Sequence, residues 1–349
     1  MFRLLAATLL TTTLLSGCVT TATKQENIGS KQTADEIRYQ RELHITTILD
    51  YQTRIDRIAN PLLKASLPFC EGQQGIYLGY RVDNLSGWSK EYRDVAKTIL
   101  KLDEALKVSS VAPDSPAARA GLKSGDIVLQ VNGHSTIAGQ GAVKDHNDLI
   151  NNLTIADTRL KIMREGEVSE ITMVPEQVCR YGVYILMSNT VNAYADGNNI
   201  YLTSGLIRFA SGDKEVAMVV GHEIAHNAME HLEAQKANSG LASIFDIISA
   251  AYGVNTQGLF ASIGGGAFSK AFEYEADYVG LYIMARAGYE VDGLDQFWRR
   301  MAAENPGTNT DSFFNTHPIS ANRVLGVQAA ITEITQKKNA GSELQPTLK

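Results

Sequence analysis

Two histidines spaced four residues apart inside an apolar stretch are the feature that most constrains this chain. The stretch reads VVGHEIAHNAMEH, residues 219–231, and contains His222 and His226 with Glu223 between them. Side chains at positions i and i+4 of an α-helix project from one face, one turn apart. The spacing therefore predicts a helix, from about residue 214 to beyond residue 232, whose two imidazole rings converge on a single ion.

This arrangement is typical of a catalytic zinc site. Two neutral imidazoles suit Zn²⁺, and Glu223 can take a proton from water that the metal has acidified. Such a site generally has three protein ligands and one open position. Downstream, residues 269–289 have helical periodicity and place Glu273 and Asp277 four residues apart. One acid can bind the metal while the other fixes a ligand histidine. The alternative is a solvated acidic face, which is the interpretation we prefer for Glu275.

The N-terminus predicts export and lipidation. Arg3 precedes an apolar run, residues 4–15, which is too short for a permanent transmembrane helix. We predict a signal peptide over residues 1–17, because Leu15-Ser16-Gly17-Cys18 resembles the lipobox of bacterial lipoproteins, in which the cysteine is lipidated. The alternative is an ordinary cleaved signal. The next residue is not the Asp of an inner-membrane retention signal, so in a Gram-negative host the resemblance implies an outer-membrane lipoprotein. Residues 18–32 are small and polar, as in a flexible tether.

Export places the other two cysteines of the chain in an oxidising compartment. These are Cys70 and Cys179, and two thiols in such a compartment can pair. We therefore expect a disulfide that clasps the segment between them.

The pattern of the chain changes at these cysteines, which divides it into domains. Residues 33–68 carry a helical pattern that should stop at Asn60-Pro61, and we assign this helix to the same domain as residues 180–335. Residues 70–179 consist of short β-like runs and turns. The polar end of the chain, residues 336–349, is expected to be disordered.

The segment between the cysteines contains a PDZ-like pattern. Residues 115–133, SPAARAGLKSGDIVLQVNG, resemble PDZ domains of HtrA-class periplasmic proteases, which implies a short helix at 117–120 and a turn at Asn132-Gly133. In such domains a loop receives a peptide carboxylate while the peptide adds a strand to the sheet. The residues that resemble this loop are Tyr77, Leu78, Gly79 and Tyr80. Residues 146–153 would flank the groove. The alternatives are a generic small β-domain, or a PDZ domain that acts only as a spacer or contact surface.

The metal-binding motifs carry a second resemblance. H-E-I-A-H at residues 222–226, followed by E-Y-E-A-D at residues 273–277, resembles the zinc metallopeptidase family that includes HtpX, BepA, LoiP and the CAAX prenyl proteases. The resemblance implies that Glu273 is the third zinc ligand. It also implies that Asp277 corresponds to the aspartate of the family's active site.

Two further stretches agree with this family. Asn192, Ala193 and Tyr194 resemble the strand that lies above the zinc, to which an extended substrate would add through its backbone. His317 lies in a segment that resembles the family's T-H-P motif, whose histidine is near the metal. It could stabilise the oxyanion or, in a resting state, occupy the open zinc position. The alternative is a structural histidine in a turn.

Together these features predict an α+β fold, namely a mostly helical zincin-type metallopeptidase domain with a small sheet, interrupted by an inserted β-rich PDZ domain. Unlike HtpX, the chain has no apolar run after its signal that compares with a membrane span. The most apolar stretch, residues 239–269, is broken by glycines and polar residues, and we interpret it as a mobile flap or a contact surface. The remaining histidines are interpreted as surface or structural residues: His44, His134, His146 and His231.

We therefore expect a lipid-anchored periplasmic metalloendopeptidase with one Zn²⁺ per chain. Its expected partners are unfolded or misassembled envelope proteins, which the PDZ domain recruits or gates. One alternative is a PDZ-based assembly factor or chaperone with a latent metal site, and another is hydrolysis of an envelope polymer such as peptidoglycan cross-links. A formal net charge of -6 without a dense Lys/Arg block disfavours nucleic-acid binding.

Overall fold

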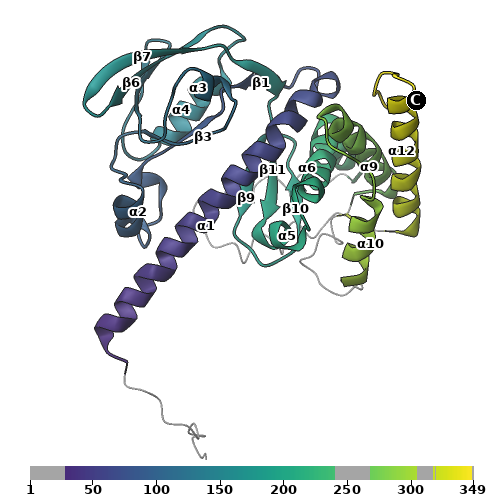
Figure 1. The fold of residues 1–349 in the computed structure, drawn as a ribbon, viewed down its shortest axis with the longest axis horizontal. Helices are drawn as coiled ribbons and strands as arrows, with labels where there is room; N and C mark the ends of the chain where they lie inside the picture. Colours follow the sequence, from purple (N-terminus) through teal and green to yellow (C-terminus); the bar gives the residue numbers. More distant parts are fainter. Residues whose placement is uncertain (1–27, 240–267, 305–316, 319, 348–349) are drawn as a thin grey trace, which may run out of the picture. The chain divides into compact units, whose positions relative to one another are not determined.

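The computed structural model describes residues 28–239, 268–304, 317–318 and 320–347 (Figure 1). The chain divides into a unit of residues 1–40 and a unit of residues 41–349. The predicted signal peptide, the lipidation site at Cys18, most of the tether and nearly all of the apolar stretch at 239–269 lie outside the described residues. Within the described ranges, no helix combines the length and apolar character needed to cross a membrane.

The first helix, α1, is longer than its sequence pattern indicates. It runs from Ser30 to Ala65 and contains Pro61, so the predicted stop at Asn60-Pro61 is wrong. Proline removes one intrahelical hydrogen bond but does not prevent helical φ at its own position. The residues that follow, Leu62 and Leu63, are buried, and their packing holds the helix beyond the proline.

The segment between the cysteines forms a six-stranded sheet with the strand order β2-β3-β4-β6-β7 and β5 paired to β4. All of these pairs are antiparallel. The same segment contains the short helix α3 (Pro116–Arg119) and the helix α4 (Ala142–Asn151). Asn132 and Gly133 both have positive φ, 48° and 83°, as a tight hairpin turn requires. The strands are β2 (Tyr80–Asp83), β3 (Lys107–Val111), β4 (Ile127–Val131), β5 (His134–Ser135), β6 (Thr158–Arg164) and β7 (Glu167–Met173).

An unpredicted helical insertion connects β2 to β3. It contains the 3₁₀ turn η2 (Leu85–Gly87) and the helix α2 (Arg93–Ile99). Val95 and Ala96 of α2 share a small buried cluster with Ile45 of α1. The insertion therefore packs the sheet-containing segment onto the first helix.

The two ends of this segment are joined to each other by a strand pair and a disulfide. The 3₁₀ turn η1 (Leu67–Phe69) follows α1, and then β1 (Gln74–Tyr77) pairs antiparallel with β8 (Glu176–Cys179). A disulfide joins Cys70 to Cys179 with an S–S distance of 2.02 Å. The chain thus enters and leaves the segment at one place.

The rest of the chain builds a helical domain around a three-stranded sheet. In the sheet order β10-β11-β9, β11 is antiparallel to β10 and parallel to β9. The strands are β9 (Gly182–Leu186), β10 (Ala193–Ala195) and β11 (Asn199–Thr203). The helices are α5 (Ser204–Phe209), α6 (Asp213–Ala228), α7 (His231–Ser239), α9 (Lys270–Arg286), α10 (Asp295–Glu304) and α12 (Ala321–Asn339).

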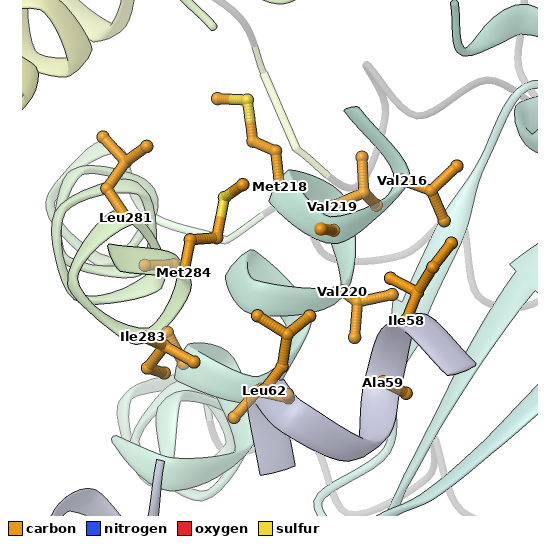
Figure 2. Packing of buried hydrophobic residues seen from close by; sticks show 14 of the residues in the cluster. Ile58, Ala59, Leu62, Val216, Met218, Val219, Val220, Leu281, Ile283 and Met284 are labelled. Carbon is orange, nitrogen blue, oxygen red and sulfur yellow. The ribbon is translucent and has the colours of Figure 1, made fainter. Parts of the chain in front are cut away.

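The core of this domain lies where α1, α6 and α9 come together. Figure 2 shows Leu62 of α1, Val220 of α6 and Ile283 of α9 among the buried side chains of one apolar cluster. The cluster lines the inner faces of the helices that carry the two metal-binding motifs. Burial of this apolar surface is the main force that fixes α6 against α9.

Two helix ends differ from the prediction. The helix of the first motif ends at Ala228 rather than beyond residue 232, because Glu230 has a φ of 53°, which no right-handed helix contains. The expected disordered tail is wrong for residues 336–347. Helix α12 continues to Asn339 beside α9 (Figure 1). After it, the Arg286 side chain donates to the Leu344 carbonyl at 3.2 Å.

Candidate metal centre

A close crossing of two helices brings the metal-binding motifs together. Gly221 of α6 and Gly280 of α9 lie at the crossing, and both are glycines for a steric reason. A Cβ on Gly280 would lie 2.9 Å from the carbonyl carbon of Gly221 and from the backbone nitrogen of His222. Because neither residue has a side chain, the backbones approach closely enough for His222 to face the acidic residues of α9.

Four buried side chains converge at this crossing, and their donor atoms all lie within 4.8 Å of one another. The Nε2 atoms of His222 and His226 are 3.1 Å apart. Glu273 Oε1 lies 3.4 Å from His226 Nε2 and 2.9 Å from Nδ1 of His317. Three imidazoles and one carboxylate are the nitrogen and oxygen donors that Zn²⁺ prefers, so these residues fit a zinc ion.

Glu223 has the surroundings expected of a residue that acts on a bound water. Its side chain is fully buried, and neither carboxylate oxygen has a hydrogen-bond partner among the described residues. Its Oε1 lies 3.5 Å from His317 Nε2. Burial raises the pKa of Glu223 above its ordinary value. A buried carboxylate without a partner is costly, and it fits a site completed by a metal and water.

A second layer of contacts holds the ligands in place. Asp277 Oδ1 lies 3.0 Å from His222 Nδ1, so the Nε2 atom of His222 is left facing the centre. Arg323, only 1% exposed, donates to both oxygens of Asp277 at 2.8 and 2.9 Å. Its Nη1 also lies 2.6 Å from Glu273 Oε2. The guanidinium stacks over the Trp298 ring at 4.8 Å.

Neighbouring side chains keep both acids ionised despite their burial. Burial alone would raise the pKa of Asp277, but the charge of Arg323 and its hydrogen bonds hold that pKa below the ordinary value. Burial opposes ionisation of Glu273 in the same way. The neighbouring His317, His226 and Arg323 nevertheless hold the pKa of Glu273 well below its ordinary value. Both acids are therefore carboxylates, as metal binding and histidine orientation require.

His317 is tied into the centre by its backbone as well as by its ring. Arg323 donates to the carbonyls of His317 and Pro318 at 3.3 and 3.1 Å. The ring Nδ1 lies 3.3 Å from His222 Nε2. The preceding residues of the T-H-P segment lie outside the described residues.

Two residues that the sequence analysis did not include among the site residues, His231 and Glu275, adjoin this centre. His231 is 1% exposed, and its Nδ1 lies 3.0 Å from Nδ1 of His226. Its Nε2 lies 2.9 Å from Glu275, whose side chain remains 47% exposed. In a continuous helix His231 would point away from His226. The break at Glu230 turns it back, and the sequence carries no clear signal of that break.

The loop at residues 77–80, which resembles the carboxylate-binding loop of PDZ domains, is constrained by a close contact and by backbone hydrogen bonds. Gly79 has a φ of 81°, and a Cβ there would lie 2.0 Å from Cβ of Ser115. The carbonyl of Leu78 accepts from Ala117 at 2.8 Å and that of Gly79 from Ala112 at 2.8 Å. These bonds join Leu78 and Gly79 of the loop to the residues around α3.

The structure also gives the surroundings of Tyr80 and of the proposed substrate strand. The hydroxyl of Tyr80, in β2, pairs with Nε2 of the buried His146 in α4 at 2.9 Å. Two of the three residues of the proposed substrate strand, Ala193 and Tyr194, lie in β10, which is an edge of its sheet and contacts α6. Its Ala193 is buried, and the Asn192 amide donates to the Tyr194 hydroxyl.

Comparisons with known proteins agree with this geometry. A model described as peptidase family M48 matches residues 157–331, and a PDZ domain model matches residues 107–146. The metalloprotease YcaL of Escherichia coli is 32% identical over 160 residues, covering 43% of this chain and 61% of YcaL.

More distant relatives and one solved structure are also similar. The mitochondrial metalloendopeptidase OMA1 of Schizosaccharomyces pombe is 26% identical, covering 46% of this chain and 49% of OMA1. A β-barrel assembly-enhancing protease of Yersinia pestis is 24% identical, covering 46% of this chain and 36% of that protease. A crystal structure of the HtrA3 PDZ domain with a phage-derived ligand is 21% identical at a TM-score of 0.23, covering 30% of this chain and 88% of that domain.

The chain spans less than two thirds of the length of each of these curated relatives. The family model nevertheless covers half of the chain and includes both metal-binding motifs. The α+β fold and the resemblance seen in the sequence are thereby confirmed. This chain belongs to peptidase family M48.

Proposed function

We propose that the protein is a zinc-dependent metalloendopeptidase. One observation carries the proposal: a buried Glu223, whose carboxylate has no hydrogen-bond partner among the described residues, stands beside the four donors of His222, His226, Glu273 and His317. A structural zinc site would not need a buried carboxylate without a hydrogen bond. A hydrolytic site does, because the carboxylate must accept and return a proton.

In this mechanism each residue has a separate role. His222, His226 and Glu273 would hold the ion, oriented by Asp277 and the outer contacts. When bound, zinc acidifies water and withdraws charge from the scissile carbonyl. Glu223 accepts the proton of the attacking water and then donates it to the departing amine.

His317 would have a resting role. Its Nδ1 atom lies 3.3 Å from His222 Nε2 and 2.9 Å from Glu273 Oε1, which supports the proposal that it would bind the ion as a fourth ligand. Substrate would then have to displace this ring. A ring displaced in this way would be available to stabilise the oxyanion of the scissile carbonyl.

The proposed substrates are unfolded or misassembled proteins of a bacterial envelope. An extended chain would add to β10 through backbone hydrogen bonds, which select for unfolded segments more than for sequence. The PDZ domain would recruit or gate these chains through Tyr77, Leu78, Gly79 and Tyr80. The name of the β-barrel assembly-enhancing relatives supports an envelope role. We further propose that a lipid on Cys18 anchors the protein to the outer membrane, facing the periplasm.

The test combines zinc content with cleavage of unfolded casein, with and without a chelator. The wild type is expected to bind one zinc and to cleave casein, and the chelator should abolish cleavage. E223Q should keep zinc and lose at least a hundredfold in cleavage rate. If E223Q cleaves like the wild type, the assigned base is wrong.

The same preparation separates the proposal from the other two functions. An assembly factor with a latent metal site would bind zinc without cleaving casein, and E223Q would still function in cells. Hydrolysis of peptidoglycan cross-links would appear in a murein digestion assay that the casein assay does not detect.

A further inference from the structure

Each of the two ligand histidines on α6 has its outer ring nitrogen engaged, but by different partners. His222 Nδ1 lies 3.0 Å from the carboxylate of Asp277. His226 Nδ1 instead lies 3.0 Å from Nδ1 of another imidazole, His231. His231 Nε2 in turn lies 2.9 Å from Glu275 Oε2. The second ligand is therefore held by a hydrogen-bonded series of two further residues, His231 and then Glu275.

The proton positions along the series His226, His231 and Glu275 follow from the chemistry of its members. At one end Glu275 is a carboxylate, which only accepts, so His231 carries its proton on Nε2 and donates it there. The Nδ1 atom of His231 is then an acceptor. His226 must supply the proton between the two rings, so its own proton is on Nδ1.

This arrangement leaves the lone pair of His226 Nε2 directed at the metal centre. Nε2 is the atom that lies 3.1 Å from His222 Nε2 and 3.4 Å from Glu273 Oε1. In the opposite arrangement the His226 proton would be on Nε2 and would point at the cation. The acceptor at His231 therefore selects the tautomer that can bind metal.

The packing around both rings keeps this geometry. Phe272 stacks on the His231 ring with centroids 4.5 Å apart and an interplanar angle of 16°. Phe268 stacks on His226 at 4.0 Å and 25°. Glu230, with its φ of 53°, turns the chain so that His231 starts α7 beside α6. Glu275 is half exposed, with 47% of its side chain accessible, so it can be changed without disturbing the core.

We propose that His231, anchored by Glu275, is a positioning residue that fixes the tautomer and orientation of the zinc ligand His226. This inference rests on the proposed zinc site. Outer partners of metal-ligating histidines commonly change metal affinity by about 10- to 100-fold when they are removed. The acceptor atom at position 231 should account for an effect of that size here.

The experiment measures the zinc dissociation constant by competition with a chelator, for the wild type and three variants of the full chain. H231F keeps a ring that can stack on Phe272 but removes the acceptor. H231N keeps an acceptor, because the Asn Oδ1 takes the place of the His Nδ1. E275A removes the carboxylate that accepts from His231, at a half-exposed site. The unfolding temperature of each metal-free protein serves as the control for folding.

We expect H231F to weaken zinc binding by about 10- to 100-fold, H231N to stay within about threefold of the wild type, and E275A to fall between them. Nitrogen NMR of the metal-free wild type should show the His226 proton on Nδ1, and E275A should show a mixture of tautomers. If H231F does not fold, the zinc affinity and the NMR spectrum of E275A test the proposal: wild-type affinity together with an unchanged His226 tautomer would overturn it.

Equal zinc affinity of H231F and wild type would overturn the proposal. So would an H231N protein as weak as H231F, because the shape of the ring and not its acceptor would then matter. Failure of the wild type itself to bind zinc would refute the metal site instead, so the two outcomes are distinguishable.

Discussion

The close crossing of α6 and α9 leads to a specific prediction: replacing Gly280 by Ala should loosen the metal centre without changing any ligand side chain. The added methyl would lie 2.9 Å from backbone atoms of Gly221 and His222, where ordinary contacts are 3.4–4 Å. These atoms are backbone and cannot rotate away. The two helices must therefore separate by about 0.5 Å, which is the tolerance within which functional side chains have to be held.

Two opposing effects set the size of the change in stability. An alanine at an open position inside a helix is more favourable than glycine by about 0.5–1 kcal/mol. Overpacking of a close contact costs about 1–3 kcal/mol. We therefore expect G280A to lower the free energy of unfolding by about 1 to 2 kcal/mol. A displacement of the ligands by this amount should also reduce casein cleavage by at least tenfold.

Urea unfolding of the metal-free protein, the zinc dissociation constant and casein cleavage measure these effects. The matched control is G212A at the start of α6, where an added Cβ meets no atom within 4 Å. It should leave zinc affinity and cleavage close to the wild-type values. If G280A matches the wild type in stability and in zinc affinity, the steric account of the crossing is wrong.

Three further predictions concern other parts of the molecule. H317A should raise basal casein cleavage if the ring closes the metal site at rest; a loss of cleavage with unchanged zinc affinity would favour the oxyanion role alone. R323K keeps the charge but not the paired bonds to Asp277, so cleavage should fall by more than tenfold; wild-type activity would contradict the proposed clamp. Burial lowers the pKa of His146 from 6.5 to about 4, so the unfolded chain binds the additional proton as pH falls through this window. Acidification should therefore lower the free energy of unfolding of the wild type by about 3 kcal/mol more than that of H146Q. Urea unfolding at each pH measures this difference, and an equal dependence on pH in the two proteins would refute the prediction.

Several features of the site could be predicted from the sequence because they depend on local geometry. The helical repeat places His222 and His226 on one face, and the same repeat pairs Glu273 with Asp277. The turn at Asn132-Gly133 is equally local, since only a few residue types adopt positive φ at low cost. Such features need no knowledge of the remainder of the chain.

Other features depend on contacts between distant segments. Packing of Leu62 and Leu63 keeps α1 helical past a proline that would end an isolated helix. The segment that follows α12 is polar in sequence, yet its Leu344 carbonyl accepts from Arg286 of α9. The gain from each contact appears only when both partners are in place.

The sequence by itself determined which side chains can bind a metal, because ligand chemistry and helical spacing are properties of short segments. Only the tertiary structure showed that Arg323 and His231 hold those ligands and their neighbouring acid in place. Arg323 reaches both Glu273 and Asp277, and His231 reaches His226 through a break in the helix. Hydrogen bonds between side chains require donor and acceptor to meet within about 3 Å. That condition is set by how the helices cross and end, which the local pattern does not contain.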